Sequence, residues 1–361
     1  MGCRNVFAFP ALCSLLYAVL SSSYVSAESF SFVALGDTAY NPPADYPAYR
    51  ALIERINSAK PAFTIHVGDT WGILDCSDAE HERIRDFFQE YDHPVIYTPG
   101  DNEWIDCLIP DAVPRAQRIV SGTPTDQDIA VLNDARSLDG AYERRVWVDG
   151  QQSLTAIRRI FFGTRQSLGQ KPIALTRQAD VSGFNEMVEN ALWEYGDVQF
   201  GTVHVPGSGN NFFINSREHA IEAIARNRAN VEWIKQIFAE ARSNDSKAVV
   251  IALHASLFED GPGGDFTGQA VRGGETGPFY WIALAIRDLG ADFDRPVLLV
   301  NGDFHEFVVD RPFMVSAGES APPRYANITR LQVHGAPEIK AVRVTVDTKT
   351  PWVFGFSPLH N

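Results

Sequence analysis

The stretch VLLVNGDFH (residues 297–305) joins an apolar run to a Gly-Asp pair and then to a histidine. Three earlier apolar runs also end in Gly-Asp, and a fifth ends in a histidine. Short apolar runs bounded by glycine are typical of buried strands in a parallel sheet. These runs occupy residues 32–37, 64–69, 95–101 and 249–254.

The polar residues that end these runs predict one shared site. Ligands of open α/β sheets bind where the strands end, so the carboxylates and imidazoles should gather at one rim. Several buried carboxylates in one place are unfavourable unless positive charge neutralises them, and a pair of divalent metal ions is the obvious source. The competing interpretation is turn chemistry, because Gly-Asp is a common turn pair.

The spacing of the runs indicates alternating strands and helices. Gly36, Gly68 and Gly100 are evenly spaced at about the length of one βαβ unit. Helical periodicity then predicts a long helix over residues 219–243, with Ile221, Ile224, Trp233, Ile234, Ile237 and Phe238 as its core face. Shorter helices are expected at 47–59, 78–91 with Asp78 as its cap, 153–162 and 277–289. Gly196-Asp197 predicts a hairpin between 186–195 and 198–205, and the alternating tail at 328–356 predicts antiparallel strands.

Length and charge limit the class of protein. The chain has 361 residues, 45% of them hydrophobic and 21% charged, with a formal net charge of −14 and no basic run. Nucleic acids and anionic membranes both require a basic face, so neither is an expected partner. We expect one domain over 28–361, with an irregular insertion at 108–185 near the rim and a glycine-rich loop at 261–277.

The first residues predict export. Arg4 precedes an apolar stretch at 6–20, and small and polar residues follow as far as Ala27. This layout is that of a secretory signal peptide at 1–27, which implies a secreted or periplasmic protein without a membrane after cleavage. An uncleaved membrane anchor is the alternative, although the apolar core is short for a membrane span.

Two cysteines remain beyond that segment, Cys76 and Cys107. An even number in an exported protein favours a disulfide, and each cysteine follows a Gly-Asp strand end. Two free thiols are the alternative, and a metal-binding role is the weaker one, since a carboxylate-rich site does not call for soft ligands.

Five short motifs resemble those of the calcineurin-like metallophosphoesterase superfamily. They lie in the same order, each after an apolar strand, over residues 30–307. They read Asp37-Thr38-Ala39, Gly68-Asp69-Thr70-Trp71-Gly72, Gly100-Asp101-Asn102-Glu103, His254 and Gly302-Asp303-Phe304-His305. The forms GDNEW (100–104) and HVPGS (204–208) resemble a divergent exported branch of that superfamily. The resemblance implies an α/β fold with two packed mixed β-sheets flanked by helices, a four-layer sandwich.

The resemblance also implies two divalent metal ions and their ligands. Asp37 and His305 would hold the first ion, Asp69 would bridge both, and Asp101, His254 and Asp303 would hold the second. Aspartate stands where the superfamily has asparagine and histidine, at positions 101 and 303. Oxygen ligands favour Mn²⁺, Fe, Mg²⁺ or Ca²⁺ over Zn²⁺.

Two departures concern the chemistry. Ala39 replaces a ligating histidine, and Gly72 stands where the purple acid phosphatases have a ligating tyrosine, so the nearby Tyr40 is the candidate substitute. Asn102 replaces the histidine that protonates the leaving group; an amide is no general acid, but it can hydrogen-bond a phosphoryl oxygen. The rate of hydrolysis would fall least for substrates whose leaving groups are already acidic.

The function implied is metal-dependent hydrolysis of a phosphoester or phosphoanhydride in a small phosphorylated substrate, outside the cytoplasm. Two alternatives stay open: a pseudo-phosphatase that acts as a binding module, and an exported protein with structural Ca²⁺ at the rim. We interpret His66 as a core residue, Glu103 and Trp104 as loop scaffold, and His204, Asn210 and Asn211 as structural.

Overall fold

A computed structural model describes residues 29–72, 76–107, 123, 125–126, 150–212, 217–258, 271–313 and 325–360. The predicted signal peptide (1–27), most of 108–149 in the predicted insertion, and most of the glycine-rich loop at 261–277 lie outside the described residues. Among the described helices, none combines the length and apolar character needed to cross a bilayer.

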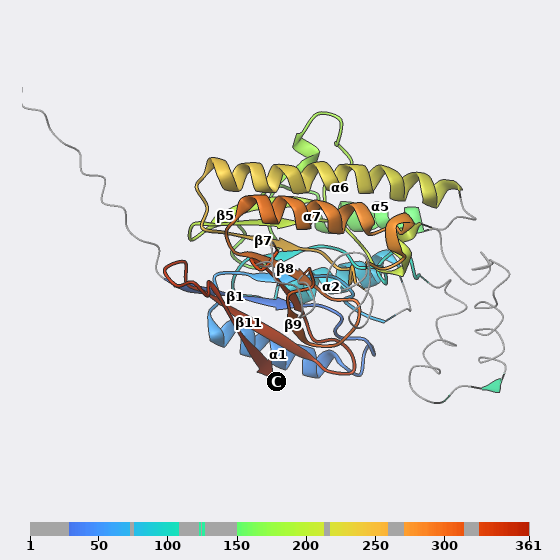
Figure 1. The fold of residues 1–361 in the computed structure, drawn as a ribbon. Helices are drawn as coiled ribbons and strands as arrows, with labels where there is room; N and C mark the ends of the chain where they lie inside the picture. Colours follow the sequence, from blue (N-terminus) through green and yellow to red (C-terminus); the bar gives the residue numbers. More distant parts are fainter. Residues whose placement is uncertain are drawn as a thin grey trace, which may run out of the picture.

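Two sheets form the centre of the molecule (Figure 1). The five-stranded sheet has the order β12-β11-β1-β2-β3, and the seven-stranded sheet has the order β4-β5-β6-β7-β8-β10-β9. Within them, β1, β2 and β3 are parallel, as are β6, β7, β8 and β10. The strands are β1 (Phe30–Leu35), β2 (Thr64–His66), β3 (Val95–Tyr97), β4 (Thr176–Arg177), β5 (Ala191–Tyr195), β6 (Val198–Thr202), β7 (Ala248–Ala252), β8 (Val297–Asn301), β9 (Val308–Asp310), β10 (Ile328–Gln332), β11 (Lys340–Val346) and β12 (Phe354–His360).

Helices cover both outer faces, which gives four layers. One apolar core lies between the sheets and includes Phe32, Phe200 and Leu298. A second core packs α6 and α7 on the seven-stranded sheet, and a third packs α1, α2 and α5 on the five-stranded sheet. The helices are α1 (Tyr46–Ala59), α2 (Asp78–Phe88), α5 (Gly150–Phe161), α6 (Arg217–Ser243) and α7 (Tyr280–Phe293). The predicted α/β sandwich is therefore confirmed.

The predicted helices and hairpin are present, with shifted ends. The α2 helix stops at Phe88, before the predicted Tyr91, and α7 begins at Tyr280 and runs on to Phe293. The prediction of Asp78 as the cap of α2 was wrong. Ser77 is the N-cap, and its hydroxyl accepts from the amide of Glu80. Asp78 is the first helical residue, where its charge suits the helix dipole. Strands β5 and β6 pair as the predicted hairpin at Gly196-Asp197.

The predicted core face of the long helix was wrong in its first turns. Ile221 and Ile224 are 56% and 51% exposed, whereas Trp233 and Phe238 are fully buried. At 3.6 residues per turn, Ile224 and Trp233 differ by about 180° around the helix, so they cannot share one face. Ala223 and Arg226 take the inward positions instead.

The tail differs from the predicted antiparallel unit. Strands β11 and β12 do form an antiparallel pair, and β11 continues antiparallel to β1. Strand β10, however, enters the other sheet, parallel to β8 and antiparallel to the short edge strand β9. Alternation of apolar and polar residues identifies a strand, but it does not identify the partner of that strand.

Candidate metal centre

The predicted site residues follow the carboxyl ends of strands in both sheets. Asp37, Asp69 and Asp101 come after β1, β2 and β3, while His254 and Asp303 come after β7 and β8. The two edges meet, because the amide of Asp303 donates to the carboxylate of Asp37, 3.0 Å and 3.2 Å from its two oxygens. The sheets therefore bring these five side chains into one place.

The ligand atoms form two groups that share one histidine. Asp37, Asp69 and His254 make the first group, and Asp101, His254 and Asp303 make the second; within each, the ligand atoms lie within 4.8 Å of one another. Asp37, Asp69, Asp101 and His254 are buried. Four carboxylates at such separation need positive charge nearby.

His254 turns its Nε2 toward these carboxylates. Its Nδ1 lies 2.8 Å from the carbonyl oxygen of Val67, which can only accept, so Nδ1 carries the hydrogen of the neutral ring. Its Nε2 then faces Asp101 Oδ1 at 2.9 Å and Asp69 Oδ1 at 3.4 Å. Within the described structure, His254 Nε2 and Asp101 Oδ1 are buried without a hydrogen-bond partner. Lone pairs that face one another in this way fit a divalent cation between them.

The pKa shifts reflect the same crowding of acids. Burial raises the pKa of Asp37 to about 7, against the opposing effect of His254, and burial also raises the pKa of Asp69 well above its usual range. Burial alone would lower the pKa of His254, but Asp69, Asp101 and Asp37 together raise it well above its usual range. In the absence of a cation, protons collect on this cluster, and a divalent ion would displace them.

Close approach explains why glycine precedes two of the aspartates. A Cβ on Gly100 would lie 2.0 Å from Asp69 Oδ1, and a Cβ on Gly302 would lie 2.2 Å from Asp37 Oδ2. A side chain there would displace the aspartate, so Gly100 leaves room for the carboxylate that follows the neighbouring strand, and Gly302 for the carboxylate that follows a strand of the other sheet.

Several site residues also have a left-handed backbone. The φ angles are 49° at Asp37, 53° at Asp69, 79° at Asp303 and 62° at His305. This conformation is uncommon for residues other than glycine, and it tends to occur at functional sites that the rest of the fold supports.

Tyr40 lies inside the site, close to the position left by Ala39. Its hydroxyl donates to Asp69 Oδ2 at 2.5 Å and lies 3.1 Å from His305 Nε2. Gly72 makes room for it, since a Cβ there would lie 2.8 Å from the Tyr40 carbonyl oxygen. His305 Nδ1 lies 3.0 Å from the carbonyl of Ala336, so its Nε2 is also a lone-pair atom. One hydroxyl hydrogen cannot serve both Asp69 and His305, which leaves a surplus of acceptors.

His305 lies at the margin of the cluster. Its Nε2 is 3.7 Å from Asp37 Oδ1, and its side chain is 30% exposed. It belongs to neither of the two groups described above, and Tyr40 lies between it and Asp69. Its predicted role as a ligand of the first ion stays a prediction.

Asn102 has both of its amide hydrogens engaged. Its Nδ2 donates to the hydroxyl of Tyr40 and to the carbonyl of Trp71, each at 2.9 Å. Its backbone amide donates to Asp69 Oδ1 at 3.1 Å. Asn102 therefore holds Tyr40 and Asp69 in place, and its predicted contact with a phosphoryl oxygen stays a prediction.

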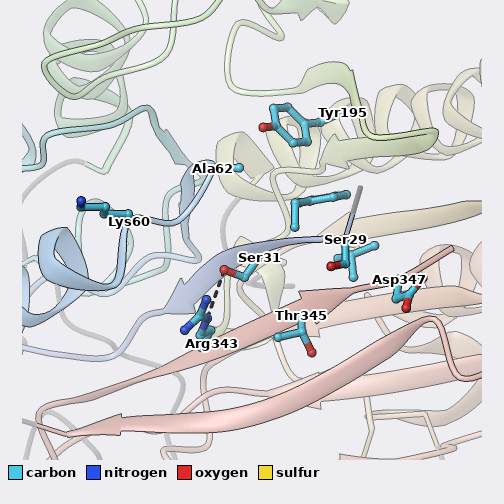
Figure 2. A pocket seen from close by; sticks show the side chains of 10 residues that line it. Ser29, Ser31, Lys60, Ala62, Tyr195, Arg343, Thr345 and Asp347 are labelled. Carbon is cyan, nitrogen blue, oxygen red and sulfur yellow. Dashed lines mark hydrogen bonds between the residues drawn. The ribbon is translucent and has the colours of Figure 1, made fainter. Parts of the chain in front are cut away.

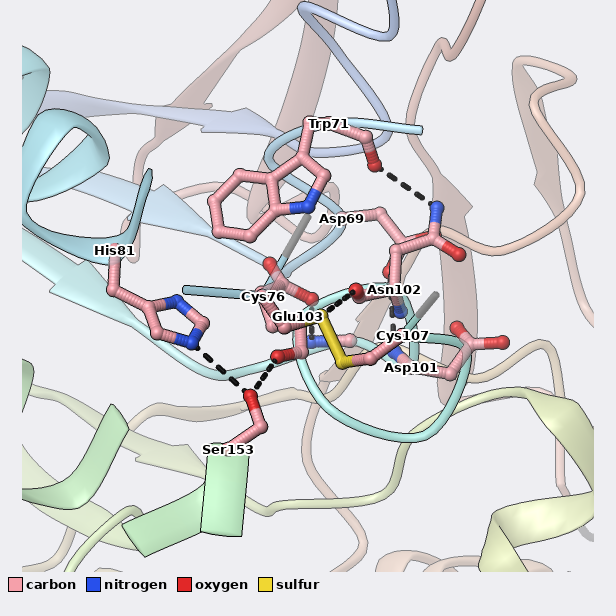
Figure 3. The surroundings of a disulfide bond; sticks show 10 residues. Asp69, Trp71, Cys76, His81, Asp101, Asn102, Glu103, Cys107 and Ser153 are labelled. Carbon is pink, nitrogen blue, oxygen red and sulfur yellow. Dashed lines mark hydrogen bonds between the residues drawn. A yellow bond between two sulfur atoms is a disulfide. The ribbon is translucent and has the colours of Figure 1, made fainter. Parts of the chain in front are cut away.

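The loop around Asn102 is fixed by a disulfide and by a buried glutamate (Figure 3). Cys76 and Cys107 are bonded, which confirms the disulfide over the free thiols. Glu103 accepts from the amides of Thr70 and Gly100, both at 3.0 Å, and from the Tyr97 hydroxyl at 3.1 Å. These contacts confirm Glu103 as loop scaffold. Burial is also found at Trp104, His66, His204, Asn210 and Asn211, whose structural roles stay predictions.

Three further residues at the site escaped the sequence analysis. Asp106 is buried beside Asp101, and burial together with that neighbour raises its pKa to about 8. Ser208 donates to Asp106 at 2.6 Å. Arg272 forms an ion pair with Asp303. Asp106 and Arg272 stand in no motif and reach the site from loops, whereas Ser208 ends the HVPGS motif, for which the sequence predicted no contact with the site. The available signal for Asp106 was its place in the sequence, as the second carboxylate after Asp101.

A separate pocket lies at the other end of β1 (Figure 2). It has a volume of about 380 Å³ and is lined by Ser31, Lys60, Tyr195 and Arg343, among others. Phe30 and Ser31 are the first two residues of the strand that Asp37 follows, so this pocket is remote from the candidate metal centre. We assign it no role.

The chain matches no family model and no curated protein sequence. Among the solved structures that its fold resembles are three that each cover 92% of this chain. PhoD shares 10% identity at a TM-score of 0.51, with 68% of that chain covered. GAP50, titled the anchor in the inner membrane complex of Plasmodium, shares 9% at a TM-score of 0.43, with 89% covered. A dimetal phosphatase from Danio rerio shares 9% at a TM-score of 0.44, with 98% covered.

At such identities a likeness concerns the fold alone, and the argument rests on PhoD, for which the TM-score exceeds 0.5. The order of the strands, the four layers and this likeness agree with one another. The chain therefore has the metallophosphoesterase-like fold that its five motifs predicted.

Proposed function

We propose that this protein hydrolyses a phosphoester or phosphoanhydride of a small substrate, using two divalent cations held where the edges of the two sheets meet. The observation that carries the proposal is the position of two carboxylates, those of Asp101 and Asp69, beside His254 Nε2. Its Nε2 lies 2.9 Å from Asp101 Oδ1 and 3.4 Å from Asp69 Oδ1. In the neutral ring this nitrogen carries a lone pair, because Nδ1 holds the hydrogen. A cation between them would satisfy atoms that the described protein leaves without a partner.

We assign the ligands as follows. Asp37, His305 and Tyr40 would hold the first cation, Asp69 would lie between the two, and Asp101, His254 and Asp303 would hold the second. Tyr40 supplies the oxygen that compensates for Ala39. Most of these ligands are oxygens, which supports Mn²⁺, Fe, Mg²⁺ or Ca²⁺ over Zn²⁺.

The bound cations would supply Lewis acidity toward phosphoryl oxygens and would lower the pKa of a bound water. The protein contributes the arrangement. Val67 and Ala336 fix the ring orientations of His254 and His305 through their carbonyl oxygens. The amides of Asp101 and Asn102 hold Asp69 at 3.1 Å each, so the central carboxylate cannot rotate freely. Asn102 would bind a phosphoryl oxygen only by exchanging one of its two side-chain hydrogen bonds.

The location that we propose is outside the cytoplasm, either secreted or periplasmic. The disulfide between Cys76 and Cys107 supports it, because such bonds persist in oxidising compartments. The signal-like composition of residues 1–27 supports it as well.

The alternative is a binding module that keeps the fold without turnover. Asn102 favours it, because both of its amide hydrogens are used within the protein and an amide cannot act as a general acid in place of the expected histidine. The experiment that separates the two is hydrolysis of aryl phosphate monoesters and diesters by the exported form, with Mn²⁺ and with EDTA. Metal-dependent turnover supports the enzyme. A folded, metal-loaded protein without turnover on any substrate supports the binding module.

A further inference from the structure

Arg272 lies against the second group of ligands, in a rigid setting. Its Nη1 donates to Asp303 Oδ2 and, at 2.9 Å, to the carbonyl oxygen of Ser256. Its guanidinium lies over two aromatic rings, 5.1 Å from the centroid of Phe279 and 4.8 Å from that of Phe304. Rings on the guanidinium and a carboxylate at one end restrict the side chain to one orientation.

The two oxygens of Asp303 have different surroundings. Oδ2 accepts from Arg272 and from the amide of Ser256 at 2.9 Å. Oδ1 is on the side of Asp101, since a Cβ on Gly207 would lie 2.7 Å from Oδ1 of both aspartates. Arg272 therefore leaves Oδ1 available to a cation, and the guanidinium and that cation can be present together.

Arg272 also has donors to spare. A guanidinium carries five N–H groups in a fixed fork, and the two contacts above use only Nη1. Its Nε and Nη2 donate to no residue in the described ranges, and the side chain is 25% exposed. Toward the residues that the structure describes, three N–H donors of a fixed cation thus have no acceptor, and a ligand beside the metal centre could use them.

We propose that Arg272 binds the phosphoryl oxygens of the substrate from the side of the second cation, and that it makes a phosphomonoester or a terminal phosphoanhydride the preferred substrate. This inference rests on the proposed function. A guanidinium binds two oxygens of a phosphoryl group in parallel. A monoester has three unesterified oxygens and two negative charges, so it can bind the cations and Arg272 at once. A diester has only two unesterified oxygens and one charge, so it gains less from the additional cation.

The test compares Arg272→Met with Arg272→Lys and with a matched control. Arg295 is the control, because its contacts are of the same kind at the opposite end of the strands. It pairs with Asp245 at 2.7 Å, donates to the carbonyl of Ser246 at 2.6 Å and lies over the ring of Phe293 at 5.6 Å. Asp245 and Ser246 precede β7, whereas His254 follows it. Arg295→Met therefore removes an equivalent arginine without touching the site.

Three quantities are measured on each Mn²⁺-loaded protein: metal content, the dissociation constant of inorganic phosphate by calorimetry, and KM and kcat on an aryl monoester and a diester. We expect Arg272→Met to retain its metal and to bind phosphate roughly 10- to 100-fold more weakly, as for the loss of charged hydrogen bonds. KM for the monoester should rise by a similar factor and KM for the diester by less than about threefold. Arg272→Lys should fall between, and Arg295→Met should match wild type.

Unchanged phosphate affinity and KM in Arg272→Met would overturn the inference. So would a loss of phosphate binding that follows loss of metal in both Arg272 variants, since Arg272 would then act on the metal site alone. If Arg272→Met fails to fold, Arg272→Lys carries the test. Because phosphate binding can be measured without turnover, the test of Arg272 does not depend on the test of hydrolysis. A wild-type protein without hydrolysis, whose phosphate affinity still depends on Arg272, would refute the enzyme and retain the anion site.

Discussion

The backbone amide of Asp303 lies 3.0 Å and 3.2 Å from the two carboxylate oxygens of Asp37, and this contact joins the end of β8 to the end of β1. The two residues are 266 positions apart in the chain. Each sheet alone supplies only part of the cluster: three aspartates from one, and His254 with Asp303 from the other. The site therefore depends on the packing of the two sheets, and substitutions at the contact between them should affect both metal positions.

Asp69→Asn should remove metal from both positions. Asp69 accepts from the amides of Asp101 and Asn102 and from the Tyr40 hydroxyl, so it faces both groups of ligands. The asparagine oxygen can keep part of this geometry while losing the negative charge. Metal content after dialysis is the measurement, with Asp245→Asn as the surface control. Retention of two metals in Asp69→Asn would contradict its central position.

Tyr40→Phe should release the first cation and leave the second. The change removes a single oxygen, which lies 2.5 Å from Asp69 Oδ2 and 3.1 Å from His305 Nε2. We expect the metal affinity of the first position to fall roughly 10- to 100-fold, which is the range typical for removal of a group that supports a metal ligand. Metal titration of the apo-protein resolves the two steps. Two unchanged steps would show that Tyr40 only fills space.

Asn102→His should restore proton donation to the leaving group. An imidazole there would raise kcat most for alkyl phosphates, whose leaving groups need a proton, by up to about 10²-fold. The gain on aryl phosphates should be smaller. Asn102→Gln is the control, since it keeps an amide. Equal gains on both substrate classes would refute the leaving-group argument.

Loss of the disulfide should lower both stability and metal affinity. Cys76 and Cys107 are separated by 31 residues, and closing a loop of that size stabilises a fold by about 3–4 kcal/mol. Urea unfolding of the double variant Cys76→Ser/Cys107→Ser measures the change. Wild type under reducing conditions should lose the same amount of stability as this variant. Because Asp101 lies within the closed loop, metal content should fall in the same variant. An unaffected unfolding midpoint would contradict the prediction.

His66 should make the fold less stable as the pH falls. Burial lowers the pKa of His66 to about 3, with a smaller contribution from His254. Between about pH 6.5 and pH 3 the unfolded chain binds a proton that the folded protein does not, so unfolding becomes easier by up to about 1.4 kcal/mol per pH unit. In EDTA, the free energy of unfolding of His66→Asn should depend less on pH across this window than that of wild type. Equal slopes would show that His66 is not responsible.

The sequence contained most of the fold and the centre of the site, because both depend on local patterns. An apolar run followed by Gly-Asp reports a buried strand and the residue that ends it, which is how Asp37, Asp69, Asp101 and Asp303 could be found. What failed depended on tertiary context. The exposure of Ile221 and Ile224 depends on the rotation of α6 about its axis, which two isoleucines near its start do not determine. Asp106 and Arg272 enter the site from loops, whose paths no periodicity describes. Tyr40 also lies on a loop, and only its place beside Ala39 in the sequence made it a candidate.

The left-handed backbone at Asp37, Asp69, Asp303 and His305 has a consequence for the history of such chains. Glycine or asparagine would adopt these conformations at lower cost, so the present residues reduce the stability of the fold. A descendant that no longer needed the cluster could gain stability by replacing them one at a time. Four such residues in one place are therefore what we expect of a fold that gives up stability for a site.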